Sequence, residues 1–499
     1  MDAGLHSEAW NQPLLARSRL PVEMRPREDF SVWEFLKNCV GKELTRIAMP
    51  VHFNEPLSFL QRVCEYLEYS HLLFEAERCD DPVQRLELIT AFAVSGASSN
   101  WARLGKPFNP LQGETFELDR SQDRCFRAVC EQVSHHPPTS AFHAEATDGS
   151  WIFHGAVTPK LSFLGKSVEI NPRGTVTLEF PKRLEVYTWQ NVLCKIHNII
   201  VGKLWVEHYG ELSIRCHGNG YRSELKWNSH SLIGTDQRHK LHGYIVDPAG
   251  KKVKAMYGKW MDALYSLPMD TWKRHKKGGS GRKRISELSI GAVGSGDGRP
   301  RWKSFSVELP MQQEQSTNSE PTSSTAGPDN CEDREGDEES GASTLADLSI
   351  PGQALLWRRA PRPADSRRYF SFTRFTLALN DNSDAELLAR LPGTDTRRRP
   401  DVRALELGDL ALAQAEKSRL EEKQRQALRR NSSGGVWFRP GGTATPDGRP
   451  TGCLRETTGP GTGPGAPTST ETRQPVSATD RNNSCRFLAI KLNKEIALS

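Results

Sequence analysis

The pattern of apolar and polar residues predicts helices in the first hundred residues. Residues 31–34 have the form of a helix capping box, and apolar residues follow at helical spacing as far as residue 47. A second helix is predicted to begin at 54–56, where Pro56 would occupy an early helical position. A third is predicted over 82–97, with Leu86, Ile89 and Phe92 on one face.

From about Phe116 to Trp260 apolar and polar residues alternate with a period of two, which is typical of β-strands. Short turns rich in glycine and proline separate the runs. Many strands joined by short turns predict a large antiparallel sheet that closes on itself around a ligand-sized interior. The predicted strands are Cys125–Cys130, Trp151–Val157, Thr175–Phe180, Val192–Val206, Ser223–Trp227, Gly243–Val246 and Val253–Trp260.

The rest of the chain is more varied in composition. Residues 276–348 pass from a basic cluster to a Ser/Gly/Thr-rich run and then an acidic block, which predicts a disordered insert. Disorder is also predicted for 1–28 and for the low-complexity tail 439–499. Between insert and tail the pattern predicts strands at Ala354–Trp357 and Tyr369–Leu379 and a charged helix over Asp409–Arg430. The folded domain should therefore comprise residues 29–275 and 349–438.

Composition narrows the class of protein. Hydrophobic residues make up 36% of the 499 residues, and no stretch approaches 18 apolar residues, so no membrane-spanning helix is predicted. Because the ten cysteines form no CxxC pair and no secretory signal begins the chain, we expect reduced thiols in the cytosol. The net charge of +6 suits transient contact with anionic cytoplasmic membrane surfaces. It is too diffuse to indicate a nucleic-acid partner.

The octapeptide 131–138 has two adjacent histidines, His135 and His136, followed by two prolines. Each proline pushes the preceding residue out of helical geometry, so the histidines lie at the end of an extended segment. Two imidazoles that converge in a rigid loop suit an anion such as a phosphate. The alternatives are an ordinary surface turn or a metal site. A metal would need a third or fourth ligand, and none lies nearby at a suitable spacing.

Taken whole, this octapeptide resembles the signature of the oxysterol-binding-protein family of lipid-transfer proteins. Segments 49–61, 105–116, 197–205 and 419–425 resemble the family as well. The resemblance implies an α+β fold: a large incomplete antiparallel β-barrel that encloses a lipid tunnel, with an N-terminal helical lid and a C-terminal charged helix. This agrees with the arrangement of helices and strands that periodicity predicts.

The resemblance also implies a site for a phosphoinositide headgroup. Lys106 and Asn109 match family positions that contact the headgroup, and the loop N–H groups of Phe108 and Asn109 can donate to phosphate oxygens. His135 and His136 match the phosphate-binding pair. The third group is Lys417, Glu421 and Arg425, which are spaced to lie near one helix face. Without the resemblance, these charges would be interpreted as a solvated ladder of ion pairs.

A lid is expected over the tunnel, because a sterol of about 27 carbons costs on the order of 10–20 kcal/mol to expose to water. The sequence is equally compatible with an alternative, in which the predicted helix after residues 31–34 packs in a protein core and does not serve as a lid. The candidate lid and tunnel residues are Trp33, Leu36, Val40, Leu44, Ile47 and Met49.

The expected function is that of a cytosolic lipid-transfer protein, peripheral on membranes and at contact sites. It would bind a sterol, either cholesterol or an oxysterol, and exchange it for a phosphatidylinositol phosphate between membranes. The alternative is a sensor or scaffold that binds the same lipids without bulk transfer. No cofactor, metal or catalytic motif is implied, since neither GxxxxGK nor GxSxG occurs. Residues 1–28 also lack the FF-type motif that binds an endoplasmic-reticulum receptor.

Overall fold

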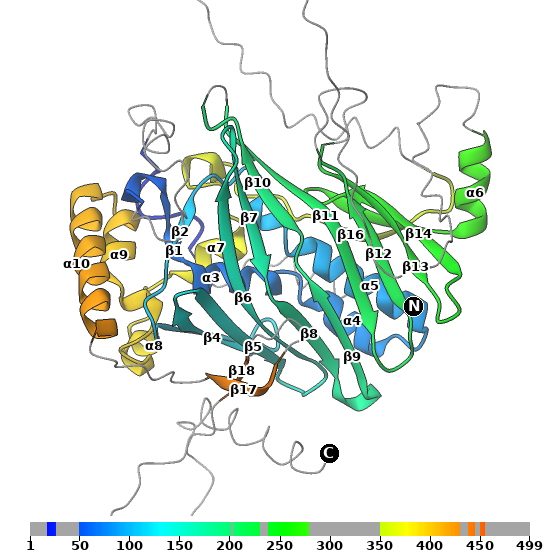
Figure 1. The fold of residues 1–499 in the computed structure, drawn as a ribbon, viewed down its shortest axis with the longest axis horizontal. Coiled ribbons are helices and arrows are strands. Elements are labelled where there is room, and N and C mark those ends of the chain that lie inside the picture. The colour runs from blue at the N-terminus through cyan, green and yellow to red at the C-terminus, as the bar shows by residue number, and fades with distance from the viewer. Residues whose placement is uncertain are drawn as a thin grey trace, which may run out of the picture. The chain divides into compact units, whose positions relative to one another are not determined.

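The alternating region of the sequence folds as one large sheet (Figure 1). The computed structural model describes residues 17–25, 49–200, 203–229, 238–278, 350–429, 438–444 and 450–454. The chain divides into two compact units, residues 1–272 with 353–499 and residues 273–352. Helix α6 (Met269–Gly278) begins in the first unit and ends in the second.

Within the described residues, fourteen strands form the sheet, and neighbouring strands in it are antiparallel. They are β3 (Thr115–Arg120), β4 (Phe126–His135), β5 (Pro138–Ala146), β6 (Ile152–Phe163), β7 (Ser167–Arg173), β8 (Thr175–Phe180), β9 (Glu185–Gln190), β10 (Leu193–His197), β11 (Trp205–Cys216), β12 (Arg222–Trp227), β13 (Lys240–Val246), β14 (Lys252–Lys259), β15 (Ala263–Pro268) and β16 (Ala354–Arg358). The order ends at β16 on one side and β3 on the other, so the barrel is incompletely closed.

The two long strands β6 and β11 each pair with different partners along their length. The first half of β6 pairs with β8 and the second half with β7. The first half of β11 pairs with β10, and its last two residues pair with β9. The sheet therefore has a separate patch, β7 with β10, between the ends of the two long strands. This patch forms a wall of the cavity described below.

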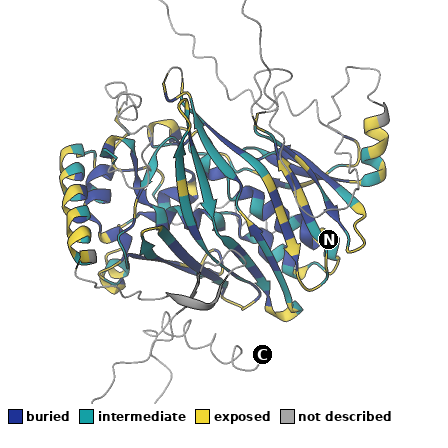
Figure 2. Cartoon of the chain, in the orientation of Figure 1, coloured by how far each residue is buried: buried dark blue, intermediate teal, exposed yellow. Residues whose placement is uncertain are grey.

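Helices α3 (Phe59–Cys64), α4 (His71–Arg78) and α5 (Pro82–Ser95) supply the core that the sheet packs against. Helix α5 begins after Asp81, whose carboxylate accepts from the N–H of Val83, and Pro82 occupies the first turn. The buried face of α5 includes Leu86, Ile89 and Phe92, as predicted. Figure 2 shows α3 and α5 largely buried.

The C-terminal helices of the described chain are α7 (Arg374–Leu379), α8 (Ala385–Arg390), α9 (Pro400–Glu406) and α10 (Leu410–Arg429). Helices α9 and α10 pack against each other and against two short segments near residues 51–58. Those segments are the 3₁₀ turn η2 (Val51–Phe53) and the strand β1 (Asn54–Ser58), which pairs in parallel with β2 (Lys106–Phe108). The charged helix predicted over 409–430 is confirmed as α10.

Three local predictions are wrong. The segment 54–58 is strand β1, and the helix begins only after Ser58, which makes a capping box with Gln61. The predicted strand Val192–Val206 is two strands, β10 and β11, and the chain reverses just after β10, where Asn198 has a φ of +62°. Residues 374–379 form helix α7 because Thr373 caps its N-terminus by accepting from the N–H of Thr376.

Two segments predicted to be disordered contain ordered residues. Within 1–28, Leu20 is buried in the main core, and Arg17 donates from Nε to the carbonyl of Leu377 at 2.9 Å. Within 439–499, strand β17 (Phe438–Ala444) pairs with β18 (Pro450–Leu454). Long-range contacts stabilise the first segment, and cross-strand pairing stabilises the second. Neither effect can be predicted from composition alone.

Candidate functional site

Lys106 lies on the short strand β2, at the start of a loop that two prolines stiffen. Its ammonium donates from Nζ to Oδ1 of Asn109 at 2.9 Å, so two of the predicted headgroup residues contact each other. Phe108 between them is fully buried among apolar residues that include Val51 and Val402. Its ring is therefore part of the core, and only its backbone can serve a ligand.

A buried ion network holds this loop in place. The two carboxylate oxygens of Glu114 accept from the hydroxyl of Ser58 and from the N–H of Leu111, each at 2.8 Å. Arg399 donates to Glu114 at 3.0 Å and to the carbonyl of Asn109 at 2.8 Å. Glu114 and Arg399 are both buried, and each makes a hydrogen bond to the loop backbone, so together they hold the loop in one conformation.

His135 ends β4 and pairs with Pro138 at the start of β5, and His136 lies in the turn between the two strands. The His136–Pro137 peptide bond is cis. The ring centroids of the two histidines are 4.6 Å apart, so the imidazoles converge as the sequence predicts. Burial and the neighbouring His136 hold the pKa of His135 below its usual value, against the opposing effect of Glu421 and the carbonyl of Pro110. Nδ1 of His135 is buried and has no hydrogen-bond partner among the described residues.

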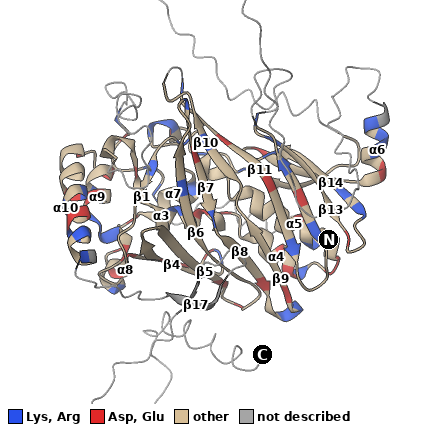
Figure 3. Cartoon of the chain, in the orientation of Figure 1, with Lys and Arg blue, Asp and Glu red and all other residues tan. Residues whose placement is uncertain are grey.

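Helix α10 carries the third group of predicted residues. Lys417 is 7% exposed and donates from Nζ to Oε1 of Glu421 at 2.5 Å. Arg425 is 54% exposed and pairs with Glu422 at 2.8 Å. Glu421 thus pairs with Lys417, and Arg425 pairs with Glu422. Figure 3 shows the mixed charges along α10.

The three segments converge in space. Lys417 and Glu421 on α10 both act on the ammonium of Lys106, and Glu421 also acts on His135. Burial first, and then the charge of Lys417, lower the pKa of Lys106 to about 8. The N–H of Gln112 donates to Oε1 of Gln424 at 2.8 Å, which joins the loop after β2 to α10. The ammonium groups of Lys106 on β2 and Lys417 on α10 thus lie close together, and such a cluster of cationic donors suits a phosphate.

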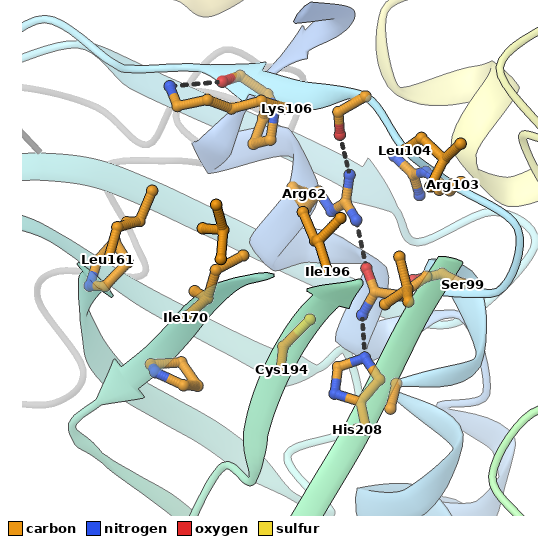
Figure 4. A pocket seen from close by; sticks show the side chains of 18 of the residues that line it. Arg62, Ser99, Arg103, Leu104, Lys106, Leu161, Ile170, Cys194, Ile196 and His208 are labelled. Atoms are coloured by element: carbon orange, nitrogen blue, oxygen red, sulfur yellow. Dashed lines mark hydrogen bonds between the residues drawn. The ribbon is translucent and has the colours of Figure 1, made fainter. Parts of the chain in front are cut away.

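An apolar cavity of about 530 Å³ opens beside this cluster (Figure 4). Its volume lies within the roughly 300–1,000 Å³ typical of small-molecule sites. Lys106 and Pro107 line it together with residues of α3, α5, β6, β7, β10 and β11. The apolar residues that line the strand side are Val157, Leu161, Val168, Ile170, Ile196, Val206 and Leu212.

Of the predicted lid and tunnel residues, Met49 lines the cavity. The others fall outside the described residues: Trp33, Leu36, Val40, Leu44 and Ile47. Among the described residues, none of the helices combines the length and the apolar character needed to cross a membrane.

A chain of three polar residues inside this cavity was not predicted from the sequence. Arg62 donates from Nη2 to Oδ1 of Asn100, and Nδ2 of Asn100 lies 3.3 Å from Nε2 of His208. All three residues line the cavity. They come from α3, the turn after α5, and β11, so no local motif could have linked them.

Comparison with known proteins agrees with this geometry. The sequence profile described as "Oxysterol-binding protein" matches residues 31–446. Human oxysterol-binding protein-related protein 1 is 45% identical over 417 residues, which cover 84% of this chain and 40% of that protein. Human oxysterol-binding protein-related protein 2 is 42% identical over 439 residues, which cover 86% of this chain and 84% of that protein. The chain thus spans less than half of related protein 1 and most of related protein 2.

Solved structures show the same fold. The Osh1 ORD domain in complex with cholesterol is 27% identical with a TM-score of 0.65, over 91% of this chain and 95% of that one. The Osh3 ORD of Saccharomyces cerevisiae in complex with PI(4)P is 26% identical with a TM-score of 0.63, over 86% and 92%. The predicted fold class and the predicted resemblance to the oxysterol-binding-protein family are both confirmed.

Proposed function

This chain belongs to the oxysterol-binding protein family, and we propose that it carries a sterol in its apolar cavity and exchanges it between membranes for a phosphatidylinositol phosphate. The observation that supports this most directly is the cluster of Lys106, His135 and Lys417, whose nitrogens can donate to a phosphate, beside an apolar cavity that Lys106 also lines. One site thus offers donors for a phosphate next to a cavity for hydrocarbon.

The headgroup would bind where β2, the β4–β5 turn and α10 meet. Lys106 and His135 both have a lowered proton affinity, because each is partly desolvated near another base or cation. A bound phosphate would favour the protonated form of each group. Asn109 and the loop amides would complete the contacts with inositol hydroxyls and phosphate oxygens.

Sterol and phosphoinositide would compete, because the acyl chains of one and the rings of the other need the same apolar volume. Competition is what allows a gradient of phosphoinositide to drive sterol transport. The carrier would act on cytoplasmic membrane faces, including contact sites, where the anionic surface attracts its net charge of +6. This role needs neither a catalytic step nor a cofactor.

The experiment is a double substitution, His135→Ala with His136→Ala, assayed for extraction of phosphatidylinositol 4-phosphate and of cholesterol from vesicles. We expect phosphoinositide extraction to be abolished and sterol extraction to stay within about threefold of wild type. His217→Ala, at an exposed histidine in the turn that follows β11, is the matched control. Equal loss of both ligands together with a lowered melting temperature would show that the histidine pair is structural and would contradict the headgroup assignment.

The alternative, a sensor or scaffold, differs in stoichiometry. A transfer protein moves many lipids per molecule between donor and acceptor vesicles, whereas a sensor saturates at one. Removing residues 29–48 should raise the sterol dissociation rate and reduce transfer, since an uncovered cargo contacts water. If both lipids bind the intact protein at once with unchanged affinities, the exchange mechanism is wrong.

A further inference from the structure

His208 lies on β11 in the wall of the apolar cavity and is only 7% exposed. Indole rings surround it, with Trp260 at 4.8 Å and Trp227 at 6.1 Å between ring centroids. Figure 4 places it on the opposite side of the pocket from Lys106. Burial, with Arg62 and His239 nearby, lowers its pKa to about 3, so the imidazole is neutral at physiological pH.

Its neighbours determine which ring nitrogen carries the proton. A guanidinium has only donors, so the contact between Arg62 and Asn100 turns the amide oxygen of Asn100 toward Arg62. The amide NH₂ of Asn100 then faces Nε2 of His208 at 3.3 Å, and an NH₂ group can only donate. Nε2 must therefore accept, and the proton of the neutral ring lies on Nδ1.

Arg62 is itself held in place. It pairs with Glu55 at 2.6 Å, and the same carboxylate binds Arg103 at 2.6 Å. Because Arg62 cannot rotate without losing this partner, the orientation of Asn100 is fixed before any ligand arrives. The chain from Arg62 through Asn100 thus pre-sets His208 as a donor.

The donor that results has no acceptor. Nδ1 of His208 is buried and has no hydrogen-bond partner among the described residues. In Figure 4 this nitrogen faces the side of the pocket where Cys194 lies, while the other nitrogen makes the drawn hydrogen bond. An unpaired buried donor is costly, and such groups are rare in folded proteins. An acceptor supplied by the cargo would remove that cost.

We propose that the Nδ1–H of His208 donates a hydrogen bond to an oxygen of the lipid held in the cavity. The oxygen is either the hydroxyl of a sterol or an ester carbonyl of a diacyl phosphoinositide. The inference rests on the proposed function, because it assigns a contact to the cargo of that same cavity. It makes His208 a specificity-determining residue, distinct from the phosphate cluster around Lys106.

The first arm of the test uses three sterols that differ only at carbon 3: a hydroxyl, a ketone, and hydrogen alone. Displacement of a fluorescent sterol gives their affinities. A donor serves hydroxyl and ketone alike, so wild type should bind these two within about threefold of each other. It should bind the deoxy compound about tenfold more weakly. His208→Leu should bind all three with similar affinity, and His208→Asn, which keeps a donor near the position of Nδ1, should restore the preference.

The second arm compares diester and diether forms of phosphatidylinositol 4-phosphate. If the acceptor is an ester carbonyl, wild type should prefer the diester about tenfold, and His208→Leu should abolish that preference. Melting temperature and the affinity for a soluble, tail-free inositol phosphate control for misfolding. A preference in either arm that depends on His208 supports the proposal and identifies the acceptor.

The proposal is overturned if His208→Leu folds normally and changes neither preference. In that case both lipids would still bind, so the proposed function would stand without this contact. Failure of wild type to bind any of these lipids would overturn both. The contact with His208 would also be contradicted if the ketosterol bound far more weakly than the hydroxysterol. A ketone can only accept a hydrogen bond, so that result would require Nδ1 to be an acceptor.

Discussion

The backbone N–H of Gln112 donates to the side-chain oxygen of Gln424 at 2.8 Å, a contact between residues 312 positions apart. Gln112 belongs to the loop that follows β2, and Gln424 lies one turn beyond Glu421 on α10. This hydrogen bond ties the loop to α10. The contact from Arg399 to the carbonyl of Asn109 ties the same loop to the residue that precedes α9.

Removing this tie should loosen the headgroup site without touching the cavity. Gln424→Ala is expected to lower the affinity for phosphatidylinositol 4-phosphate about fivefold, because one hydrogen bond contributes roughly 0.5–1.5 kcal/mol. Sterol affinity should stay the same. Gln426→Ala, at an exposed glutamine that bonds Glu422, is the matched control. A change of the same size in the control would mean that helix stability, and not the loop contact, is responsible.

The two cations of α10 should contribute unequally. Lys417 is buried beside Lys106 and Glu421, whereas Arg425 is exposed and paired with Glu422. Lys417→Ala should therefore weaken phosphoinositide extraction at least tenfold, since a charge-assisted hydrogen bond in a desolvated site is among the strong ones. Arg425→Ala should have a smaller effect, and Lys423→Ala, at an exposed position, should have none. A larger loss for Arg425→Ala would show that α10 rearranges when the lipid binds.

Phosphoinositide affinity should fall as the pH rises from 7 to 9. The pKa of Lys106 is lowered to about 8, so its ammonium loses its proton in this window, well below the usual value of about 10.5. The phosphate itself keeps its charge there, because its second pKa is near 6. The expected loss is up to about tenfold. Lys106→Arg should bind with little pH dependence over the same range, because a guanidinium stays charged. Titration by calorimetry at fixed ionic strength is the measurement.

Arg103 should be essential to stability. It is fully buried and pairs with Glu55 and Glu65, each at 2.6 Å, with its guanidinium over the ring of Phe372. Arg103→Leu removes this ion-pair partner from the buried carboxylates of Glu55 and Glu65, and should lower the free energy of unfolding by about 3–5 kcal/mol. Arg222→Leu breaks an ion pair open to solvent and should cost less than about 1 kcal/mol. Urea denaturation of both variants tests this. Similar midpoints for the two would refute the prediction.

The insert should be dispensable for lipid binding. Replacing 279–347 with a short Gly/Ser linker should leave both lipid affinities within about threefold and the melting temperature unchanged. The reason is that the flanking strands β15 and β16 pair directly, Leu264 with Trp357, through residues outside the insert. Its composition is also unsuited to a packed core. A broad or much lower melting transition would place the domain boundary elsewhere.

Features that depend on local pattern could be predicted from the sequence alone. The period of two predicted most of the strands between β4 and β14, because one face of each strand is buried and the other is not; in β8, for example, Val176, Leu178 and Phe180 are buried in alternation. The histidine pair was identifiable because two prolines fix the chain just after it. Helix α5 was identifiable because its start signal and its apolar face are both local.

How distant segments meet depends on long-range contacts that the folded structure alone shows. The strand at 54–58 looks like a helix start in isolation and becomes a strand because it pairs with β2, some fifty residues later. Lys417, Glu421 and Arg425 share a spacing, yet packing buries the first and leaves the last in water. The polar chain from Arg62 through Asn100 to His208 joins three elements that no common motif links. Burial and long-range contact set these charges and protonation states, and neither is a property of local sequence.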